Sequence, residues 1–183
     1  MSGKKLLEKL DLNMKILIFG GAGFVGRHYA NHFLKNGNEV VLVDNLASLT
    51  GAVHPKKWTL FKPFEYKKKF KFLQIDCREY FKKKFEKFNL VVNLAAIVGG
   101  REVIENNPLA VAEDLEIDTS FWRWVIKCKH DHIITYSSSA AYPVNLQTKK
   151  NFRLLKEKDV SFAGSNIGLP DLSYGWAKLN NEY

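Results

Sequence analysis

Cysteine is scarce in this chain: only Cys77 and Cys128 occur among 183 residues. So few cysteines, placed far apart in the sequence, exclude a disulfide framework and favour a reducing compartment, which we expect to be the cytoplasm. Neither cysteine has the spacing of a metal-ligating pair. Both are therefore interpreted as small buried side chains, and no metal site is expected.

Long apolar runs are absent as well. No stretch of about 18 consecutive apolar residues occurs, so the sequence predicts no transmembrane helix and no membrane partner. Residues 1–14 carry charges throughout and lack the apolar centre of a secretory signal, so we expect an N-terminal extension that is either a short helix or a frayed end. Hydrophobic residues still make up 46% of the chain, enough for the core of one domain of ordinary size.

Positive charge is in excess, with a net charge of +9. Eleven lysines lie between Lys56 and Lys87, where they alternate with aromatic residues. This pattern fits a nucleic-acid surface, but it also fits a solvated face whose aromatics are buried and whose lysine stems lie along the surface. Lysine predominates over arginine and no nucleic-acid motif is present, so we favour the solvated face and expect no nucleic-acid partner. Electrostatic attraction of an anionic substrate is a third, weaker reading.

Strand-like and helix-like segments alternate along the chain. Short apolar runs predict buried strands at 15–19, 40–43, 71–75, 89–95 and 132–138. Helical patterns cover 24–36, about 109–129 and the segment from 173 onward. Buried strands without polar alternation, separated by helices, are typical of a parallel sheet covered on both faces. We therefore predict an α/β fold, a doubly wound parallel sheet forming one domain over 15–183, with irregular segments at 45–70 and 143–172.

Three glycines follow the first predicted strand in the stretch ILIFGGAGFVGRH, residues 16–28. Gly20 permits a tight turn, Gly23 lets the backbone approach a pyrophosphate, and Gly26 lets the next helix pack closely on the sheet. The free N–H groups of that helix would then face the phosphates. A strand–turn–helix without any ligand has the same pattern, so the glycines need support from other residues.

That support comes from Asp44, which directly follows the second predicted strand. An acid about 20 residues after the glycines accepts hydrogen bonds from the hydroxyls of an adenosine ribose. Its charge would repel a 2′-phosphate, so NAD is favoured over NADP as the cofactor. The alternative is an ordinary turn or cap residue.

Six motifs occur in order: GGAGFVG, VDNL, QIDCRE, NLAA, SSSAAYP and YGWAK. Together they resemble the extended short-chain dehydrogenase/reductase family, in particular its NAD-dependent epimerases and dehydratases of nucleotide sugars. The resemblance runs from about Lys15 to Tyr183. It implies a Rossmann-type NAD-binding fold and a nucleotide-sugar substrate.

The resemblance also implies which residues hold the cofactor. The glycine loop and the start of the helix would hold the pyrophosphate. The residues after the second strand would hold the ribose, and those after the third strand would hold the adenine. The residues after the fourth strand would line the cofactor cleft. The implied residues are Gly20, Gly23, Phe24, Val25, Gly26, Asp44, Asn45, Asp76, Cys77, Ala95 and Ala96, together with Tyr174 and Lys178.

The catalytic residues that the resemblance implies are Ser138, Tyr174 and Lys178, with Ser139 as an alternative to Ser138. Tyr174 and Lys178 are four residues apart, which places them on one helical face. Tyrosine is a weak base at neutral pH, and a nearby ammonium favours its phenolate. Tyr174 would then take the proton of a sugar hydroxyl while hydride leaves the carbon, and Ser138 would hydrogen-bond the same oxygen. The structural alternative is that the serines only end a strand and cap a helix, and that Tyr174 and Lys178 are a surface pair.

The sequence departs from the family pattern at Phe19, where threonine is usual, and at Asn93, where histidine is common. The segment AAIVGG at 95–100 also resembles GDP-fucose synthase, an NADP-dependent epimerase/reductase, but Ala140 replaces the cysteine of that enzyme. Arg101, Glu102 and Glu105 are possible groups on the substrate side.

The sequence reaches Tyr183 within the helix of the YxxxK pair, so we expect a cofactor-binding portion without the substrate region of the family. Such a portion either belongs to a working epimerase/dehydratase or binds a dinucleotide without turnover. The helices at 109–129 and 173–183 form dimers in the family, so a homodimer is expected. The choice between epimerase, dehydratase and reductase stays open.

Overall fold

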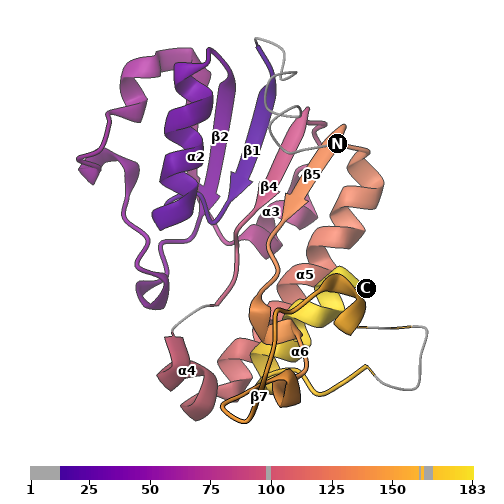
Figure 1. Cartoon of the computed structure of the whole chain (residues 1–183). Helices are drawn as coiled ribbons and strands as arrows, with labels where there is room; N and C mark the ends of the chain where they lie inside the picture. Colours follow the sequence, from indigo (N-terminus) through magenta and orange to yellow (C-terminus); the bar gives the residue numbers. More distant parts are fainter. Residues whose placement is uncertain (1–12, 98–99, 161, 163–166) are drawn as a thin grey trace. The chain divides into compact units, whose positions relative to one another are not determined.

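The computed structural model describes residues 13–97, 100–160, 162 and 167–183. The chain forms two compact units, which are described separately (Figure 1). The first contains the chain up to Ala95 together with Phe121–Thr135, and the second contains Ala96–Ser120 and Tyr136–Tyr183. The predicted extension at 1–14 falls almost entirely outside the described residues.

A five-stranded sheet, entirely parallel, forms the centre of the first unit. Its order is β3-β2-β1-β4-β5, so the chain moves outward from β1 in one direction and then in the other. The strands are β1 (Lys15–Phe19), β2 (Glu39–Asp44), β3 (Phe70–Gln74), β4 (Leu90–Asn93) and β5 (His132–Thr135). The predicted doubly wound parallel sheet is confirmed, although β5 ends three residues before the predicted boundary.

Side chains of β1 pack alternately on the two faces of the sheet. Ile16 and Ile18 belong to the core formed with α2 (Phe24–Lys35), in which Phe33 is also buried. Phe19 points to the opposite face, where its ring meets Tyr80 of α3 (Cys77–Lys83) and Trp124 of α5 (Pro108–Cys128) at centroid distances of 5.3 and 5.5 Å. Both contacts are edge-to-face, the preferred arrangement of aromatic pairs. Helices therefore cover both faces of the sheet, as a parallel sheet requires.

Helix α2 ends where the sequence predicts. Asn36 is its C-cap, and Gly37 has a φ of +82°, a left-handed conformation that glycine adopts without strain. Helix α3 was not predicted from the sequence. It is seven residues long, and the Asp76 side chain caps it by accepting a hydrogen bond from the Arg78 N–H.

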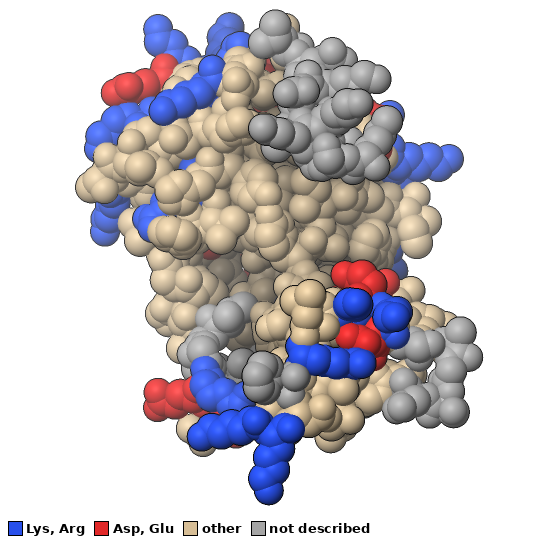
Figure 2. Space-filling view, viewed as in Figure 1, with Lys and Arg blue, Asp and Glu red and all other residues tan. Residues whose placement is uncertain are grey.

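The lysine-rich segment matches the solvated-face reading in part. All eleven lysines are exposed, and Trp58, Phe70, Tyr80 and Phe81 are buried, whereas Phe64 and Phe85 are exposed. The expectation of no nucleic-acid partner stays a prediction. Figure 2 shows lysine and arginine side chains projecting from the surface, with acidic side chains next to several of them. Two short 3-10 helices, Pro55–Lys57 and Pro63–Lys69, lie in this part of the chain, and a third, Ser48–Thr50, precedes it.

The second unit is built around helices. It contains α4 (Gly100–Asn106), the first part of α5 and α6 (Leu172–Glu182). The segment predicted as irregular holds 3-10 turns at Ser139–Ala141, Val144–Leu146 and Glu157–Asp159, with a two-residue hairpin of β6 (Gln147–Thr148) and β7 (Asn151–Phe152). In the described part of the chain, none of the helices combines the length and apolar character needed to cross a membrane.

Candidate functional site

The glycine loop after β1 is held closely against the neighbouring strand. Gly20 has a φ of +66°, and a Cβ added there would lie 2.7 Å from the carbonyl carbon of Leu94. A Cβ on Gly26 would lie 2.5 Å from the Cα of Gly21, so the helix packs on the loop itself. At Gly23 the nearest atom would be the Gly20 carbonyl oxygen at 3.3 Å. The loop is therefore tightly packed at Gly20 and Gly26 and open at Gly23.

The N-terminus of α2 follows this open side. Gly23 is its N-cap and supplies no side-chain hydrogen bond, and the first turn contains no acidic residue. Phe24 and Val25 are exposed. Free N–H groups and the positive end of the helix dipole are therefore available to an anion.

Asp44 lies at the end of β2 and ties the glycine loop to that strand. One carboxylate oxygen accepts a hydrogen bond from the Ala22 N–H at 3.0 Å, and the other accepts from the Leu46 N–H at 2.8 Å. Burial raises the pKa of this carboxyl, and the two hydrogen bonds offset part of that rise. Each oxygen keeps a second lone pair, so the carboxylate can still accept from a ligand hydroxyl.

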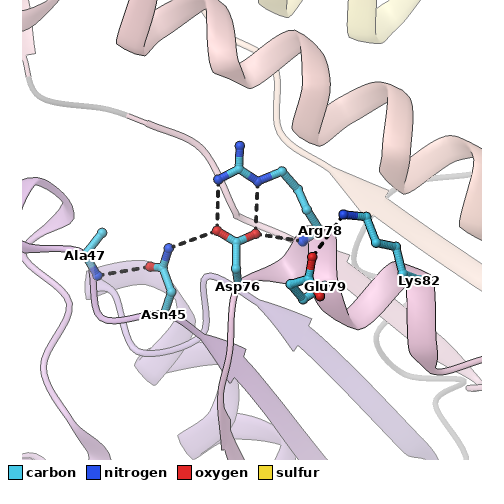
Figure 3. A network of polar contacts seen from close by, with 6 residues as sticks. All are labelled: Asn45, Ala47, Asp76, Arg78, Glu79 and Lys82. Carbon is cyan, nitrogen blue, oxygen red and sulfur yellow. Dashed lines mark hydrogen bonds and ion pairs between the residues drawn. The ribbon is translucent and has the colours of Figure 1, made fainter.

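Asp76 sits at the start of α3 in a polar network (Figure 3). The Arg78 guanidinium donates to both carboxylate oxygens at 3.0 Å, and the Asn45 amide donates at 3.4 Å. The Arg78 side chain holds the pKa of Asp76 below its ordinary value. Asn45 in turn accepts from the Ala47 N–H at 3.0 Å. The structure thus brings together the predicted ribose and adenine residues Asn45 and Asp76, but Arg78 was not foreseen.

The remaining predicted cofactor residues lie at the ends of their strands. Cys77 is buried, and burial raises the pKa of its thiol to about 12, so it stays protonated. Ala95 donates its N–H to the buried Asn93 side chain at 3.2 Å, which gives Asn93 a role in ending β4. Ala96 is half-buried and begins the second unit.

Within the second unit, Ser138 precedes the turn at Ser139–Ala141. Its hydroxyl oxygen accepts from the Ala140 N–H at 3.2 Å and so caps this turn. The capping alternative is therefore realised, yet the hydroxyl hydrogen remains able to donate. Ser139 is exposed.

The turn at Ser139–Ala141 is fastened to the start of α6 through one carbonyl group. The Ala140 oxygen accepts from the Asp171 N–H at 2.9 Å, and a Cβ added to Gly175 would lie 2.3 Å from the same oxygen. Gly175 therefore allows α6 to approach the turn that carries Ser138. The YGWAK motif contains this glycine, whose role could not be predicted from the sequence.

Tyr174 and Lys178 lie on one face of α6, as their spacing predicts. The Lys178 Nζ is 5.7 Å from the centroid of the Tyr174 ring. Lys178 is buried and Tyr174 is half-buried. A phenol and an ammonium held this close together have the composition of an acid–base group.

Arg101 of α4 is engaged within the second unit. Its guanidinium pairs with Glu105 at 2.6 Å and with Asp171 at 2.5 Å. Two of the three possible substrate-side residues thus pair with each other, while Glu102 is exposed.

Two buried acids were missed by the sequence analysis. Asp114 and Asp118 lie one turn apart on α5, and each is less than 5% exposed. The signal was their spacing of four on a helix face that also carries buried apolar residues.

Residues 16–161 match the model of the NAD dependent epimerase/dehydratase family. This chain belongs to that family. The resemblance drawn from the six motifs is confirmed, and the site residues carried over from it stay predictions.

Known proteins of similar sequence or fold are longer. Protein CapI of Staphylococcus aureus is 31% identical over 177 residues, which are 92% of this chain and 48% of CapI. The solved UDP-Glc/GlcNAc 4-epimerase of Campylobacter jejuni is 26% identical, with a TM-score of 0.65 over 93% of this chain and 47% of its own. A UDP-glucose-4-epimerase of Stenotrophomonas maltophila, solved with bound NAD, shares the fold at 19% identity and a TM-score of 0.63, over 93% and 47% of the two chains. The chain thus spans about half the length of these relatives.

Proposed function

We propose that the first unit binds NAD and that the second unit supplies the acid–base groups with which a nucleotide-sugar epimerase or dehydratase oxidises a sugar carbon. The family is one of NAD-dependent epimerases and dehydratases. The choice of NAD, the roles of single residues and the activity of this chain are the proposal.

The first unit fits a dinucleotide at three places. The loop is open at Gly23, where a diphosphate would approach the backbone. The uncapped start of α2 offers N–H groups to its charge. The Asp44 carboxylate would accept the ribose hydroxyls and repel a 2′-phosphate, which favours NAD over NADP. The NAD bound to the S. maltophila epimerase of the same fold supports this assignment.

In the second unit, Tyr174 would take the proton of a sugar hydroxyl. Bound NAD would supply the hydride acceptor for the carbon of that hydroxyl. Lys178, with its Nζ 5.7 Å from the tyrosine ring, would stabilise the phenolate. Ser138 would donate its hydroxyl hydrogen to the sugar oxygen and hold it in place. General acid–base help of this kind contributes about 10²–10⁴-fold to the rate.

The pairing of Tyr174 and Lys178 is the observation that carries the catalytic part of the proposal. Tyr174→Phe removes the proton acceptor and keeps the ring, so turnover should fall by about 10²-fold or more while NAD affinity changes little. Turnover is measured on a panel of UDP-, GDP-, dTDP- and CDP-sugars. The matched control is Tyr142→Phe, which removes a half-buried phenol of the same unit outside the proposed site. Unchanged turnover in Tyr174→Phe would contradict the mechanism.

Dinucleotide binding without turnover is the second candidate, because the glycine loop, the start of α2 and Asp44, which would hold the dinucleotide, all lie in the first unit. The same panel, run on this chain and on a chain extended by the C-terminal half of CapI, separates the two. Turnover only in the extended chain would assign this chain to cofactor binding. An NADP-dependent reaction like that of GDP-fucose synthase would instead appear as tighter binding of NADP.

A further inference from the structure

The carboxylate of Asp76 is held by two parallel side-chain hydrogen bonds from Arg78, which we call the Arg78 clamp (Figure 3). The Nε of Arg78 donates to Oδ1 and its Nη2 donates to Oδ2, each at 3.0 Å. The two side chains are 25% and 27% exposed, so water screens the pair only in part. A two-pronged pair of this kind fixes the plane of a carboxylate as well as balancing its charge.

The clamp exceeds what the start of α3 requires. Asp76 is the N-cap of this helix, and its Oδ1 also accepts from the backbone N–H of Arg78 at 2.8 Å. An N-cap needs only one short side-chain oxygen, which serine, threonine or asparagine would supply equally well. The guanidinium is therefore an addition to the cap, and it fixes an orientation that capping alone leaves free.

The clamped carboxylate lies at the edge of the sheet where two strands end. Asp44 and Gln74 are partners in the register of β2 and β3, and the Ile75 N–H donates to the Asp44 carbonyl oxygen at 3.1 Å. The next residues are thereby brought together, and the Asn45 amide reaches the Oδ2 of Asp76 at 3.4 Å. In open α/β sheets, ligands bind at the carboxyl ends of the strands. The carboxylate thus shares this edge with the glycine loop.

Four donors occupy the Asp76 carboxylate. An ionised carboxylate has about four lone-pair positions and no hydrogen to donate. The three bonds from Arg78 are 2.8, 3.0 and 3.0 Å long, whereas the bond from Asn45 is 3.4 Å, beyond the usual length of about 2.9–3.0 Å. The Asn45 amide is therefore the donor that a ligand can replace most easily. Whatever replaces it must itself be a donor.

Arg78 also keeps this carboxylate ionised. Its side-chain hydrogen bonds and its charge hold the pKa of Asp76 below the ordinary value, and the hydrogen bond from Asn45 acts in the same direction. Burial acts in the opposite direction and is the weaker effect. At neutral pH the group is consequently an acceptor with a fixed orientation.

We propose that Arg78 is a positioning residue for recognition of the cofactor base: its guanidinium fixes the Asp76 carboxylate as the acceptor for an exocyclic amino group, so that the chain prefers an aminopurine to an oxopurine. The inference rests on the proposed function, because it places the adenine of NAD beside Asp76. An amino group at position 6 of the purine donates to a carboxylate, whereas an oxygen there presents a second acceptor to it. The amino group would take the place of the Asn45 amide.

Two dinucleotides that differ at this position test the proposal. Nicotinamide hypoxanthine dinucleotide has an oxygen where NAD has the 6-amino group, and its riboses, diphosphate and nicotinamide are the same. In calorimetric titration, the 183-residue chain should bind NAD about tenfold or more tightly than the analogue. Arg78→Met removes the clamp and should reduce this preference to about threefold or less. An unchanged preference in Arg78→Met would overturn the proposal.

Arg78→Lys separates position from charge, and it carries the same test if Arg78→Met does not fold. Lysine keeps the positive charge but cannot form two parallel hydrogen bonds, so the preference for NAD should again fall. The matched control is Lys83→Met, which removes a cation of the same helix whose Nζ pairs with Glu79 at 2.9 Å. It should keep the preference of the parent. A parent-like preference in Arg78→Lys, or equal losses in Arg78→Met and Lys83→Met, would contradict a specific positioning role.

A measurement without ligand examines the clamp itself. The carboxyl carbon of Asp76 is followed by ¹³C NMR against pH, with Asp76→Asn to assign the signal. The midpoint should lie below the ordinary value in the parent, as the lowered pKa indicates, and should rise in Arg78→Met because the guanidinium is gone. Lys83→Met should leave it in place. Equal midpoints in the parent and in Arg78→Met would show that the clamp does not hold Asp76.

The titrations also separate this inference from the proposed function. If the parent chain binds neither dinucleotide, the proposed function fails and base recognition fails with it. If the parent binds both dinucleotides equally well, NAD binding stands, and only the recognition of the base through Arg78 and Asp76 is overturned.

Discussion

The carboxylate of Asp44 accepts a hydrogen bond from the backbone N–H of Ala22 at 3.0 Å. The acid at the end of β2 therefore holds the loop that follows β1. A residue predicted to bind the ribose is at the same time a structural tie for the loop predicted to bind the diphosphate. Substitution at Asp44 should thus affect both stability and cofactor binding.

Asp44→Ala leaves the Ala22 and Leu46 N–H groups without their acceptor. We expect the free energy of unfolding to fall by about 1–3 kcal/mol for each N–H that stays buried. NAD affinity should fall by about tenfold or more, because the ribose acceptor is gone. Asp44→Asn keeps one acceptor oxygen, so its free energy of unfolding should lie between those of the parent and of Asp44→Ala. Urea unfolding and calorimetric titration measure the two effects. A loss of stability without a loss of NAD affinity would show that Asp44 is an ordinary turn residue.

Gly20 and Gly51 form a matched pair for testing the loop. Their φ angles are +66° and +65°, but an added Cβ meets the Leu94 backbone at Gly20 and nothing within 4 Å at Gly51. Gly51→Ala should therefore lower the free energy of unfolding by only about 1 kcal/mol, because a side chain is strained in the left-handed conformation. Gly20→Ala should cost about 3 kcal/mol or more, since steric overlap is added. Equal losses in urea unfolding would contradict the close approach of the loop to Leu94.

The buried carboxyl of Asp118 lowers the stability of the protein in a pH-dependent way. Its pKa is raised from 3.8 to about 6, so the folded state binds a proton more tightly than the unfolded chain does. The stability of the protein should then fall as the pH rises through the window from 3.8 to about 6. At about 1.4 kcal/mol per pH unit, the full cost at neutral pH is up to about 3 kcal/mol. Asp118→Asn should remove this cost and stabilise the protein at pH 8 but not at pH 4.

Urea unfolding of the parent and of Asp118→Asn at pH 4, 6 and 8 measures this difference. The control is Glu116→Gln, which changes an exposed acid of the same helix and should alter stability equally at pH 6 and pH 8. A variant less stable than the parent at pH 8 would show that the Asp118 carboxylate stabilises the fold.

A homodimer is expected from the helices at 109–129 and 173–183. Leu115 on α5 and Trp176 on α6 are exposed apolar side chains. Light scattering should give about twice the monomer mass, and Trp176→Glu should lower it towards that of the monomer because a charge would be buried in the interface. Leu154→Glu, which changes an apolar residue that is 82% exposed, is the control and should leave the mass unchanged. A parent chain of monomer mass at high concentration would rule out the dimer.

The sequence predicted most of the sheet because apolar runs and glycine turns are local signals. Strand β1 has its predicted limits, and the close packing at Gly20 and Gly26 follows from glycine at those positions. Helix α3 was missed because seven residues rich in charge show little periodicity, and its stability comes from the Asp76 cap and the contacts of Tyr80 with Phe19.

The buried acids of α5 needed the structure. Asp114 and Asp118 look like ordinary polar residues of an amphipathic helix, and only the packing of the second unit buries them. The hydrogen bond from Ala22 to Asp44 and the close approach of Gly175 to Ala140 could not be predicted either, because each joins segments distant in the sequence. Local patterns predict elements and motifs, whereas the partners of a side chain depend on tertiary contacts.

Calorimetric titration of the 183-residue chain with NAD and with NADP tests the central claim most directly. The account predicts saturable binding of one NAD per chain, at least about tenfold tighter than that of NADP, because the Asp44 carboxylate accepts a ribose hydroxyl but repels a phosphate. Absence of binding, or tighter binding of NADP, would contradict it.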